Sequence, residues 1–156
     1  MLGRREFGIL GLAAAASVPL AAAGFAQNQS EASEGHERDQ ALQQCSQACS
    51  SCQRACDSAA THCARLLAHD GVSKELTETL LNCLLACLDC ADFCAASAQI
   101  TARGGPLVRL ICQACADACA ACAQVCEQFS DDKEMARCAE ECHTCEESCR
   151  DMLKML

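Results

Sequence analysis

The chain is poor in the side chains that usually build a protein core or bind nucleic acid. It contains no Trp and no Tyr, and aromatic residues make up only 3% of its 156 residues. Much of its 51% apolar content is Ala and Cys, so a conventional core of large interlocking side chains is undersupplied. Lys and Arg number 12 against 21 Asp and Glu, and the resulting net charge of −9 argues against nucleic-acid binding. The acidity is typical of the solvated exterior of a soluble helical protein.

The sequence also lacks the motifs that mark common enzyme classes. It shows no activated nucleophile, no pair of catalytic carboxylates and no phosphate-binding loop. Its Asp and Glu residues fall mostly on the outward faces of the expected helices. We therefore expect a protein that is not an enzyme.

Cysteine is abundant instead, with 18 residues, a content typical of disulfide scaffolds or metal sites. The cysteines recur at steps of three and four, the spacing of a helix seam that faces a partner. They form four groups: Cys45, Cys49, Cys52, Cys56 and Cys63; Cys83, Cys87, Cys90 and Cys94; Cys112, Cys115, Cys119, Cys122 and Cys126; and Cys138, Cys142, Cys145 and Cys149. Positions that normally hold Leu or Ile are thus held by thiols.

Each cysteine group lies within one expected helix. The helices should span residues 36–68, 73–102, 106–129 and 131–155, with Gly71 able to adopt the left-handed conformation that ends the first. The last should begin with a capping box in which Asp131 is the N-cap. Short connections between helices of this length indicate antiparallel neighbours. The predicted fold is all-α, an up-down-up-down four-helix bundle with a cysteine-lined core.

The N-terminus resembles a targeting segment. Arg4 and Arg5 precede a weakly hydrophobic, Ala-rich run, which is the twin-arginine pattern, and cleavage is expected after Ala26 or Ala23. A Sec-type signal or an uncleaved anchor are the alternatives. We expect residues 1–26 to direct export to the periplasm, with no membrane segment in the mature protein.

Two further divisions follow this segment. Residues 27–35 are polar and low in apolar side chains, so we expect a flexible leader. Residues 36–156 contain every cysteine and should form the bundle domain.

Antiparallel order predicts how the thiols meet in space. The expected layers are Cys45 with Cys94, Cys112 and Cys149; Cys49 with Cys90, Cys115 and Cys145; Cys52 with Cys87, Cys119 and Cys142; and Cys56 with Cys83, Cys122 and Cys138. Cys63 and Cys126 should lie beyond the last layer. This register is a hypothesis that uses every cysteine.

The two ends of the predicted stripe differ in chemistry. An apolar plug should close the first end, formed by Leu42, Val108, Met152 and Leu156. The other end brings Met135, His62 and His69 near the last thiols, where they are candidate additional ligands. Met135 could equally fill a gap, and the two histidines could simply be solvated.

Three explanations compete for a seam built of thiols. Cysteine can act as a small buried hydrophobe, but four groups of it would pack poorly and oxidise easily. A disulfide framework would suit an exported protein, yet cysteines three or four apart on one helix are too far apart to bridge. It would also place cysteines in loops, which here contain none. Soft metal binding fits the pattern best.

Charge then discriminates among the metals. Buried thiolates without counter-ions would cost several kcal/mol each. About one Cu⁺ per thiolate leaves the core near neutral, whereas Zn²⁺ with four thiolates leaves about two negative charges per site. Iron–sulfur clusters prefer compact cages of four cysteines to a continuous seam. Multiple Cu(I) ions are therefore favoured, while a general thiolate sink for Zn²⁺ or Cd²⁺ and a disulfide-stapled or redox-active periplasmic protein remain alternatives.

The paired arginines followed by four helices with Cys-x-x-x-Cys-x-x-Cys-x-x-x-Cys stripes resemble the bacterial copper storage proteins, most of all their exported branch. The resemblance covers nearly the whole chain, although the thiol count is closer to that of cytosolic relatives. It implies a four-helix bundle that stores many Cu(I) ions on the eighteen cysteines, with Met135, His62 or His69 assisting at an open end. It also implies a homotetramer and exchange of copper with a donor or recipient protein.

Overall fold

The structure of the chain is a computed structural model that describes the backbone of residues 21–156 and the side chains of residues 35–156. Most of the predicted targeting segment, residues 1–20, lies outside the described residues. The chain divides into two units, Met1–Glu34 and Gly35–Leu156, and all cysteines belong to the second.

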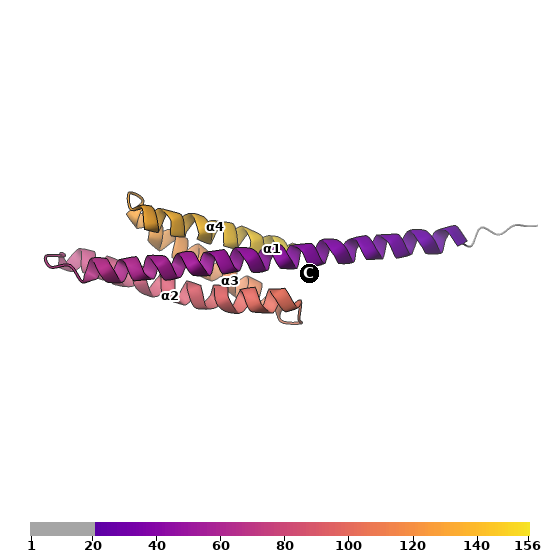
Figure 1. Cartoon of the computed structure of the whole chain (residues 1–156), viewed down its shortest axis with the longest axis horizontal. Coiled ribbons are helices and arrows are strands. Elements are labelled where there is room, and N and C mark those ends of the chain that lie inside the picture. Colours follow the sequence, from indigo (N-terminus) through magenta and orange to yellow (C-terminus); the bar gives the residue numbers. More distant parts are fainter. Residues whose placement is uncertain (1–20) are drawn as a thin grey trace, which may run out of the picture. The chain divides into compact units, whose positions relative to one another are not determined.

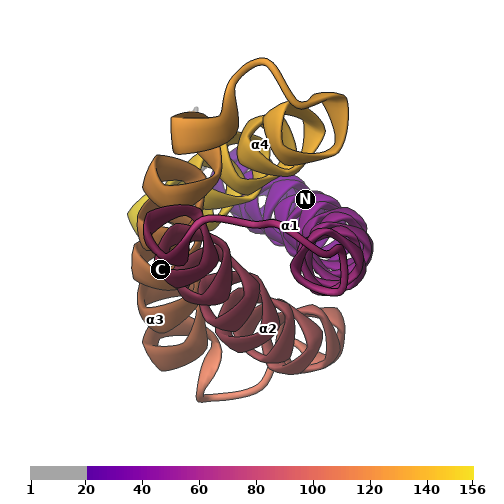
Figure 2. The ribbon, with the colours of Figure 1, turned by 90° about the vertical axis from the view of Figure 1, so that its left-hand side faces the viewer.

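The described residues form four long helices and one short one. They are α1 (Ala21–Leu67), α2 (Lys74–Arg103), α3 (Val108–Cys126), the 3₁₀ turn η1 (Glu127–Phe129) and α4 (Lys133–Lys154) (Figure 1). No strand occurs between residues 21 and 156. Within the unit Gly35–Leu156 the four helices surround a common core, as the end-on view in Figure 2 shows. The predicted all-α four-helix bundle is confirmed.

The start of α1 differs from the prediction. The helix begins at Ala21 and not at residue 36, so residues 27–35 are helical where a flexible leader was expected. The stretch contains no proline and is made largely of Gln, Glu, Ala and Ser, so little in it opposes a helix. The division between leader and bundle stays a prediction.

The helix ends follow from local chemistry. Ser73 caps α2 by accepting a hydrogen bond from the Leu76 N–H, and Gly104 ends that helix at a φ of 60°. A Cβ atom at Gly104 would meet Leu42 Cδ1 at 3.2 Å, so the turn is also tight against α1. The predicted cap of α4 is wrong by one residue: Asp132, in extended conformation, accepts from the backbone N–H groups of the helix's first turn.

One end of the bundle is closed by hydrocarbon, as predicted. Leu42, Val108 and Met152 are buried at 8%, 1% and 1% exposure. Leu156 does not join them and is 37% exposed, because it follows the end of α4. By length and composition α2 and the segment Val108–Phe129 could cross a membrane, but the cysteine-bearing side of each is buried in the bundle.

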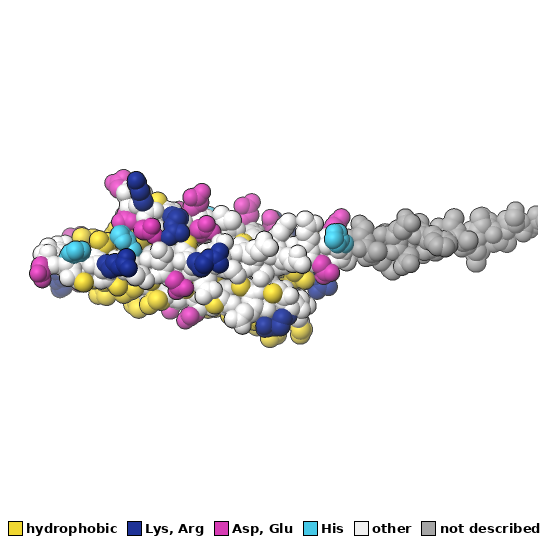
Figure 3. All heavy atoms as spheres, in the orientation of Figure 1, with side chains coloured by type: hydrophobic (Ala, Val, Ile, Leu, Met, Phe, Trp, Pro, Cys, Tyr) yellow, Lys and Arg dark blue, Asp and Glu magenta, His cyan; other side chains and the backbone are white. Residues whose placement is uncertain are grey.

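The surface separates apolar from charged side chains. Leu76, Leu81, Leu85, Leu88 and Phe93 of α2 are each more than 40% exposed. Figure 3 shows hydrophobic side chains gathered on one side of the bundle and acidic and basic side chains intermixed on another. The ion pairs of Arg137 with Glu134 and of Arg150 with Glu146 lie on α4.

Candidate metal centre

All eighteen cysteines point into the bundle core. None is more than 1% exposed, and all are free thiols. Sulfur contacts of 3.6 to 4.0 Å run without a break from Cys45 to Cys138, and a second set joins Cys122, Cys87, Cys126 and Cys83. The two sets meet in a group of four, Cys56, Cys122, Cys138 and Cys142, whose sulfur atoms lie within 4.8 Å of one another. The thiols therefore form one continuous row along the bundle, which we call the file.

The predicted register holds for α1, α3 and α4. Cys45 Sγ lies 3.9 Å from Cys112 Sγ and 3.7 Å from Cys149 Sγ. The next layer repeats this, with Cys49 Sγ 4.0 Å from Cys115 Sγ and 3.6 Å from Cys145 Sγ. In the same way Cys52 meets Cys119 and Cys142, and Cys56 meets Cys138. The layer expectation for these three helices is confirmed.

The register of α2 is wrong by one layer. Cys94 does not contact Cys45; its sulfur lies 3.8 Å from Cys115 Sγ and 4.0 Å from Cys145 Sγ, in the second layer. Cys90 accordingly contacts Cys119 at 3.7 Å. The remaining two follow: Cys87 meets Cys122, and Cys83 meets Cys126. The predicted end of α2 differs from the observed one by a single residue, so the error concerns how far α2 lies along its neighbours and not the length of the helix.

The shift leaves a position on α2 that sequence reasoning missed. Ser97, three residues after Cys94, is fully buried and takes the next place on the α2 seam, toward the first layer; the Cys49 thiol of the second layer donates to its Oγ at 3.3 Å. Thr101, four residues further, is also fully buried, and its hydroxyl donates to the Ser97 carbonyl at 2.7 Å. Both residues continue the three–four rhythm of α2, so following the seam beyond its last cysteine would have found them.

Met135 fills the matching gap at the other end. It is fully buried, and its Sδ lies 3.8 Å from Cys83 Sγ and 4.0 Å from Cys63 Sγ. The core thus has five layers across four helices, with cysteine everywhere except at Ser97 and Met135. The fifth layer, Cys63, Cys83, Cys126 and Met135, presents three thiols and one thioether.

The two candidate histidines do not join the thiols. His62 Nε2 is 2.7 Å from Asp132 Oδ2, a hydrogen bond that joins α1 to the N-cap of α4. His69 is exposed in the turn after α1. Asp132 links this pair to Met135, since its other oxygen accepts the Met135 N–H at 3.2 Å. Burial raises the Asp132 pKa, but the hydrogen bonds from His62, Met135 and Glu134 outweigh it and lower the pKa.

Hydrogen bonds between thiols set the acidity of the core. Those from Cys149 and Cys45 lower the pKa of Cys112 to about 4. At the opposite end those from Cys122, and then from Cys83 and Cys87, lower the pKa of Cys126 to about 5. Thiols that donate such bonds become harder to ionise: hydrogen bonding to Cys112 raises the pKa of Cys45, and hydrogen bonding to Cys112 and Cys115 raises that of Cys149. The network therefore places thiols that ionise more easily beside thiols that ionise less easily, at both ends of the core.

Several groups of four sulfur atoms are compact enough to share one ion. Within each group the atoms lie within 4.8 Å of one another. The groups are Cys49, Cys115, Cys145 and Cys149; Cys52, Cys94, Cys119 and Cys145; Cys52, Cys56, Cys90 and Cys142; Cys56, Cys122, Cys138 and Cys142; and Cys87, Cys122, Cys126 and Cys138. Soft thiolates at this density suit Cu(I).

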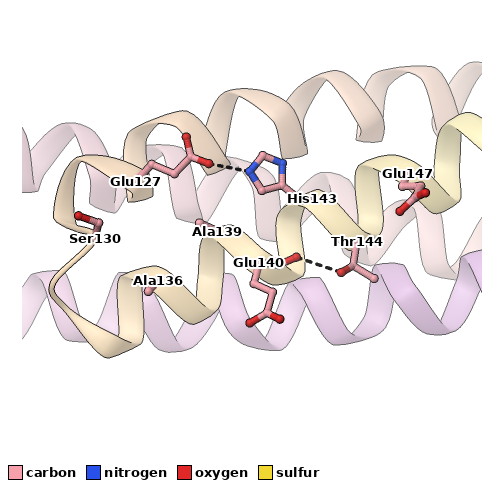
Figure 4. A pocket seen from close by; sticks show the side chains of 8 residues that line it. All are labelled: Glu127, Ser130, Ala136, Ala139, Glu140, His143, Thr144 and Glu147. Carbon is pink, nitrogen blue, oxygen red and sulfur yellow. Dashed lines mark hydrogen bonds and ion pairs between the residues drawn. The ribbon is translucent and has the colours of Figure 1, made fainter.

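A pocket of about 440 Å³ on the outer surface is separate from this core. Glu127 and several α4 residues line it, and His143 Nε2 lies 2.7 Å from Glu127 Oε1 across it (Figure 4). In Figure 4 the carboxylate of Glu140 points away from His143. None of the lining residues is a cysteine, so this pocket and the thiol core do not share residues.

Comparison with known proteins agrees with the geometry. The family model described as copper storage protein matches residues 20–154. A solved structure of a cytosolic copper storage protein from Streptomyces lividans with five coppers is 29% identical, covers 76% of this chain and 97% of its own, and gives a TM-score of 0.66. Ccsp from the same organism, loaded with 10 copper equivalents, is 30% identical, covers 75% and 86%, and gives 0.65. None of the curated proteins compared matches the chain.

These relatives correct one prediction and establish the family. Periplasmic localisation is overturned, because the similar solved protein is described as cytosolic. The inference had depended on Arg4 and Arg5, which lie outside the described residues. Copper storage, by contrast, is supported by the family match, the copper-loaded structures and the buried thiol groups together. The chain belongs to the copper storage protein family.

Proposed function

We propose that this copper store holds its Cu(I) ions along the whole file of eighteen cysteines. The observation that carries the proposal is the continuity of the file. Neighbouring sulfur atoms lie 3.6 to 4.0 Å apart from Cys45 to Cys138 and again from Cys122 to Cys126, and the two stretches are joined by a group of four sulfur atoms within 4.8 Å of one another. Each thiolate would bridge ions of adjacent layers, so the ligand set is the file and not a series of separate cages. Residues 36–156 would form the storage domain.

Charge balance limits what this core can hold. Every layer is fully buried, so ionised thiols need a counter-charge within the core. About one Cu⁺ per thiolate supplies that charge completely. Zn²⁺ or Cd²⁺ with four thiolates each would leave negative charge in every layer, so we expect these metals to bind fewer sites and to be displaced by Cu(I).

Copper would be taken up at the Met135 end. Leu42, Val108 and Met152 close the other end with hydrocarbon. The fifth layer instead offers a thioether beside Cys63 and Cys83, both soft ligands for an arriving Cu(I) ion. His62 and His69 lie near this end but outside the thiol core, so any contact with copper would be transient.

The partners of the store would be proteins as well as copper. The exposed Leu and Phe side chains of α2 provide an apolar face on which copies of the chain could associate, and a tetramer is expected from the family resemblance. A donor would load the fifth layer and a recipient would empty it. The function is storage without catalysis, because the core thiols serve as ligands for cargo.

The proposal is tested by anaerobic titration of the fully reduced chain with Cu(I), followed by desalting and metal analysis. We expect about one copper per cysteine, retained against a competing Cu(I) chelator. If the protein retains only a few copper ions, the proposed file of eighteen ligands is wrong. A parallel loading with Zn²⁺, followed by a Cu(I) challenge, distinguishes a copper store from a general thiolate sink.

A further inference from the structure

Ser97 occupies the one α2 position in the five layers that lacks a sulfur atom. The residue is fully buried, and it lies three residues beyond Cys94 on the same seam. Its hydroxyl oxygen accepts a hydrogen bond from the Cys49 thiol at 3.3 Å. It therefore faces the same thiols that a cysteine at this position would face.

A hydroxyl at this place has different chemistry from a thiol. It stays protonated at neutral pH, and it is a hard oxygen donor, whereas Cu(I) selects soft thiolate and thioether ligands. It can still donate a hydrogen bond to a thiolate of the adjoining layers. Ser97 thus supports the sulfur atoms around it without contributing the negative charge that another Cu⁺ would need.

The surroundings of Ser97 on its outer side offer no further ligand of this kind. Thr101, the next residue on the seam, uses its hydroxyl to bond the Ser97 carbonyl at 2.7 Å. Beyond it lie the apolar side chains of Leu42, Val108 and Met152. The thiol file consequently ends on the three cysteines Cys45, Cys112 and Cys149.

We propose that Ser97 terminates the copper file: it fills the last α2 position of the seam with a hydroxyl that bonds the Cys49 thiol and leaves the first layer one thiolate short. This inference depends on the proposed ligand file. The consequence is specific: the side-chain oxygen of Ser97, in place of a cysteine sulfur, would limit how many copper ions the store binds at this end.

The test replaces that atom. In Ser97→Cys the side chain keeps its shape, and the first layer gains a fourth thiolate. We expect fully loaded, chelator-treated protein to carry one more copper than the wild type, counted by native mass spectrometry. Ala96→Cys is the matched control, since it adds a thiol to the neighbouring, exposed position of the same helix and should add no retained copper. Ser97→Ala should leave the count unchanged, because the hydroxyl is not a ligand.

Three results would overturn the inference. The first is an unchanged count in Ser97→Cys when denaturing thiol titration shows one extra reactive thiol. The second is an equal gain in Ala96→Cys, and the third is loss of a copper in Ser97→Ala, which would make the hydroxyl a ligand. Wild-type protein measured alongside separates these from failure of the ligand file itself, since in that case the wild type would not reach about one copper per cysteine.

Discussion

Truncating the two buried methionines at opposite ends of the bundle should separate stability from copper uptake. Met135 and Met152 are 0% and 1% exposed, so either Met→Ala change leaves a cavity. Such changes cost about 2–5 kcal/mol. At about 4 °C per kcal/mol for a domain of this size, each variant should melt roughly 8–20 °C lower without copper. On stability alone the two variants should be alike.

Uptake should distinguish them. Met135 places a thioether 3.8 Å from Cys83 Sγ at the proposed entrance, whereas Met152 lies in the apolar plug. We expect Met135→Ala to slow copper transfer from a Cu(I)–chelator complex on the order of tenfold, equivalent to about 1.4 kcal/mol in the barrier. Met152→Ala should load at the wild-type rate. Capacity after prolonged incubation should be the same in both, because no thiol is lost.

Met135→Ala both leaves a cavity and removes the thioether, so a variant that conserves volume is needed to separate the two effects. Met135→Leu keeps most of the packing and should cost less than about 1.5 kcal/mol, but it deletes the sulfur atom. Stopped-flow transfer should be slowed in this variant nearly as much as in Met135→Ala, with little change in melting temperature. Equal slowing by Met135→Ala and Met152→Ala, or normal uptake by Met135→Leu, would refute the argument that copper enters past the thioether.

Other changes test the support around the core. Asp132→Ala should cost about 0.5–2 kcal/mol through the lost cap. Because hydrogen bonds lower the Asp132 pKa, this cost should be full above about pH 4 and fade as pH falls through the folded-state value, a trend followed by thermal melts across pH. Cys119→Ala should lower the copper count by about one in native mass spectra. Copper retention against a chelator should weaken as pH falls, since protons compete for the thiolates; thiols whose pKa is lowered, such as Cys112 and Cys126, should resist longer than Cys45, whose pKa is raised.

The sequence predicted most of the fold because its strongest signal is periodic. Cysteines at steps of three and four fix which face of each helix is buried, whatever the connections do. Short turns at Gly71 and Gly104, each at positive φ, then make neighbouring helices antiparallel. These local rules are sufficient for the bundle and for the inward direction of every thiol.

The axial position of α2 could not be read in the same way. Periodicity defines a face but not how far one helix slides along another, and that offset depends on the turn between Arg103 and Val108 and on packing at both ends. Matching cysteine to cysteine predicted Cys94 opposite Cys45, whereas the structure places Cys94 against Cys115 and Cys145, with Ser97 beside Cys49. The rule that failed was the assumption that every layer contains only sulfur.

Sequence adjacency also misled the placement of His62. A residue next to Cys63 is rotated by about 100° around the helix, so it cannot share the seam. The His62 side chain contacts Asp132 instead. The sequence did not indicate this partner, because the N-cap of α4 was predicted at Asp131 and not at Asp132. A wheel projection excludes His62 from the seam, but only the backbone conformation of the turn identifies its partner.

The overlap of the sulfur groups would let the core act as one store, as we propose. Cys52, Cys56 and Cys142 each belong to two of the groups whose atoms lie within 4.8 Å, so a thiolate in one group is also a neighbour of the next. A Cu⁺ bound in one group lowers the negative charge felt by the adjoining one, and deprotonation of the next thiol then has to overcome less repulsion. Separate cages of four would each balance their own charge and need no neighbours. A file of shared thiolates instead spreads charge along the bundle, and the helical seam with its step of three and four is the arrangement that keeps every sulfur atom within reach of the next.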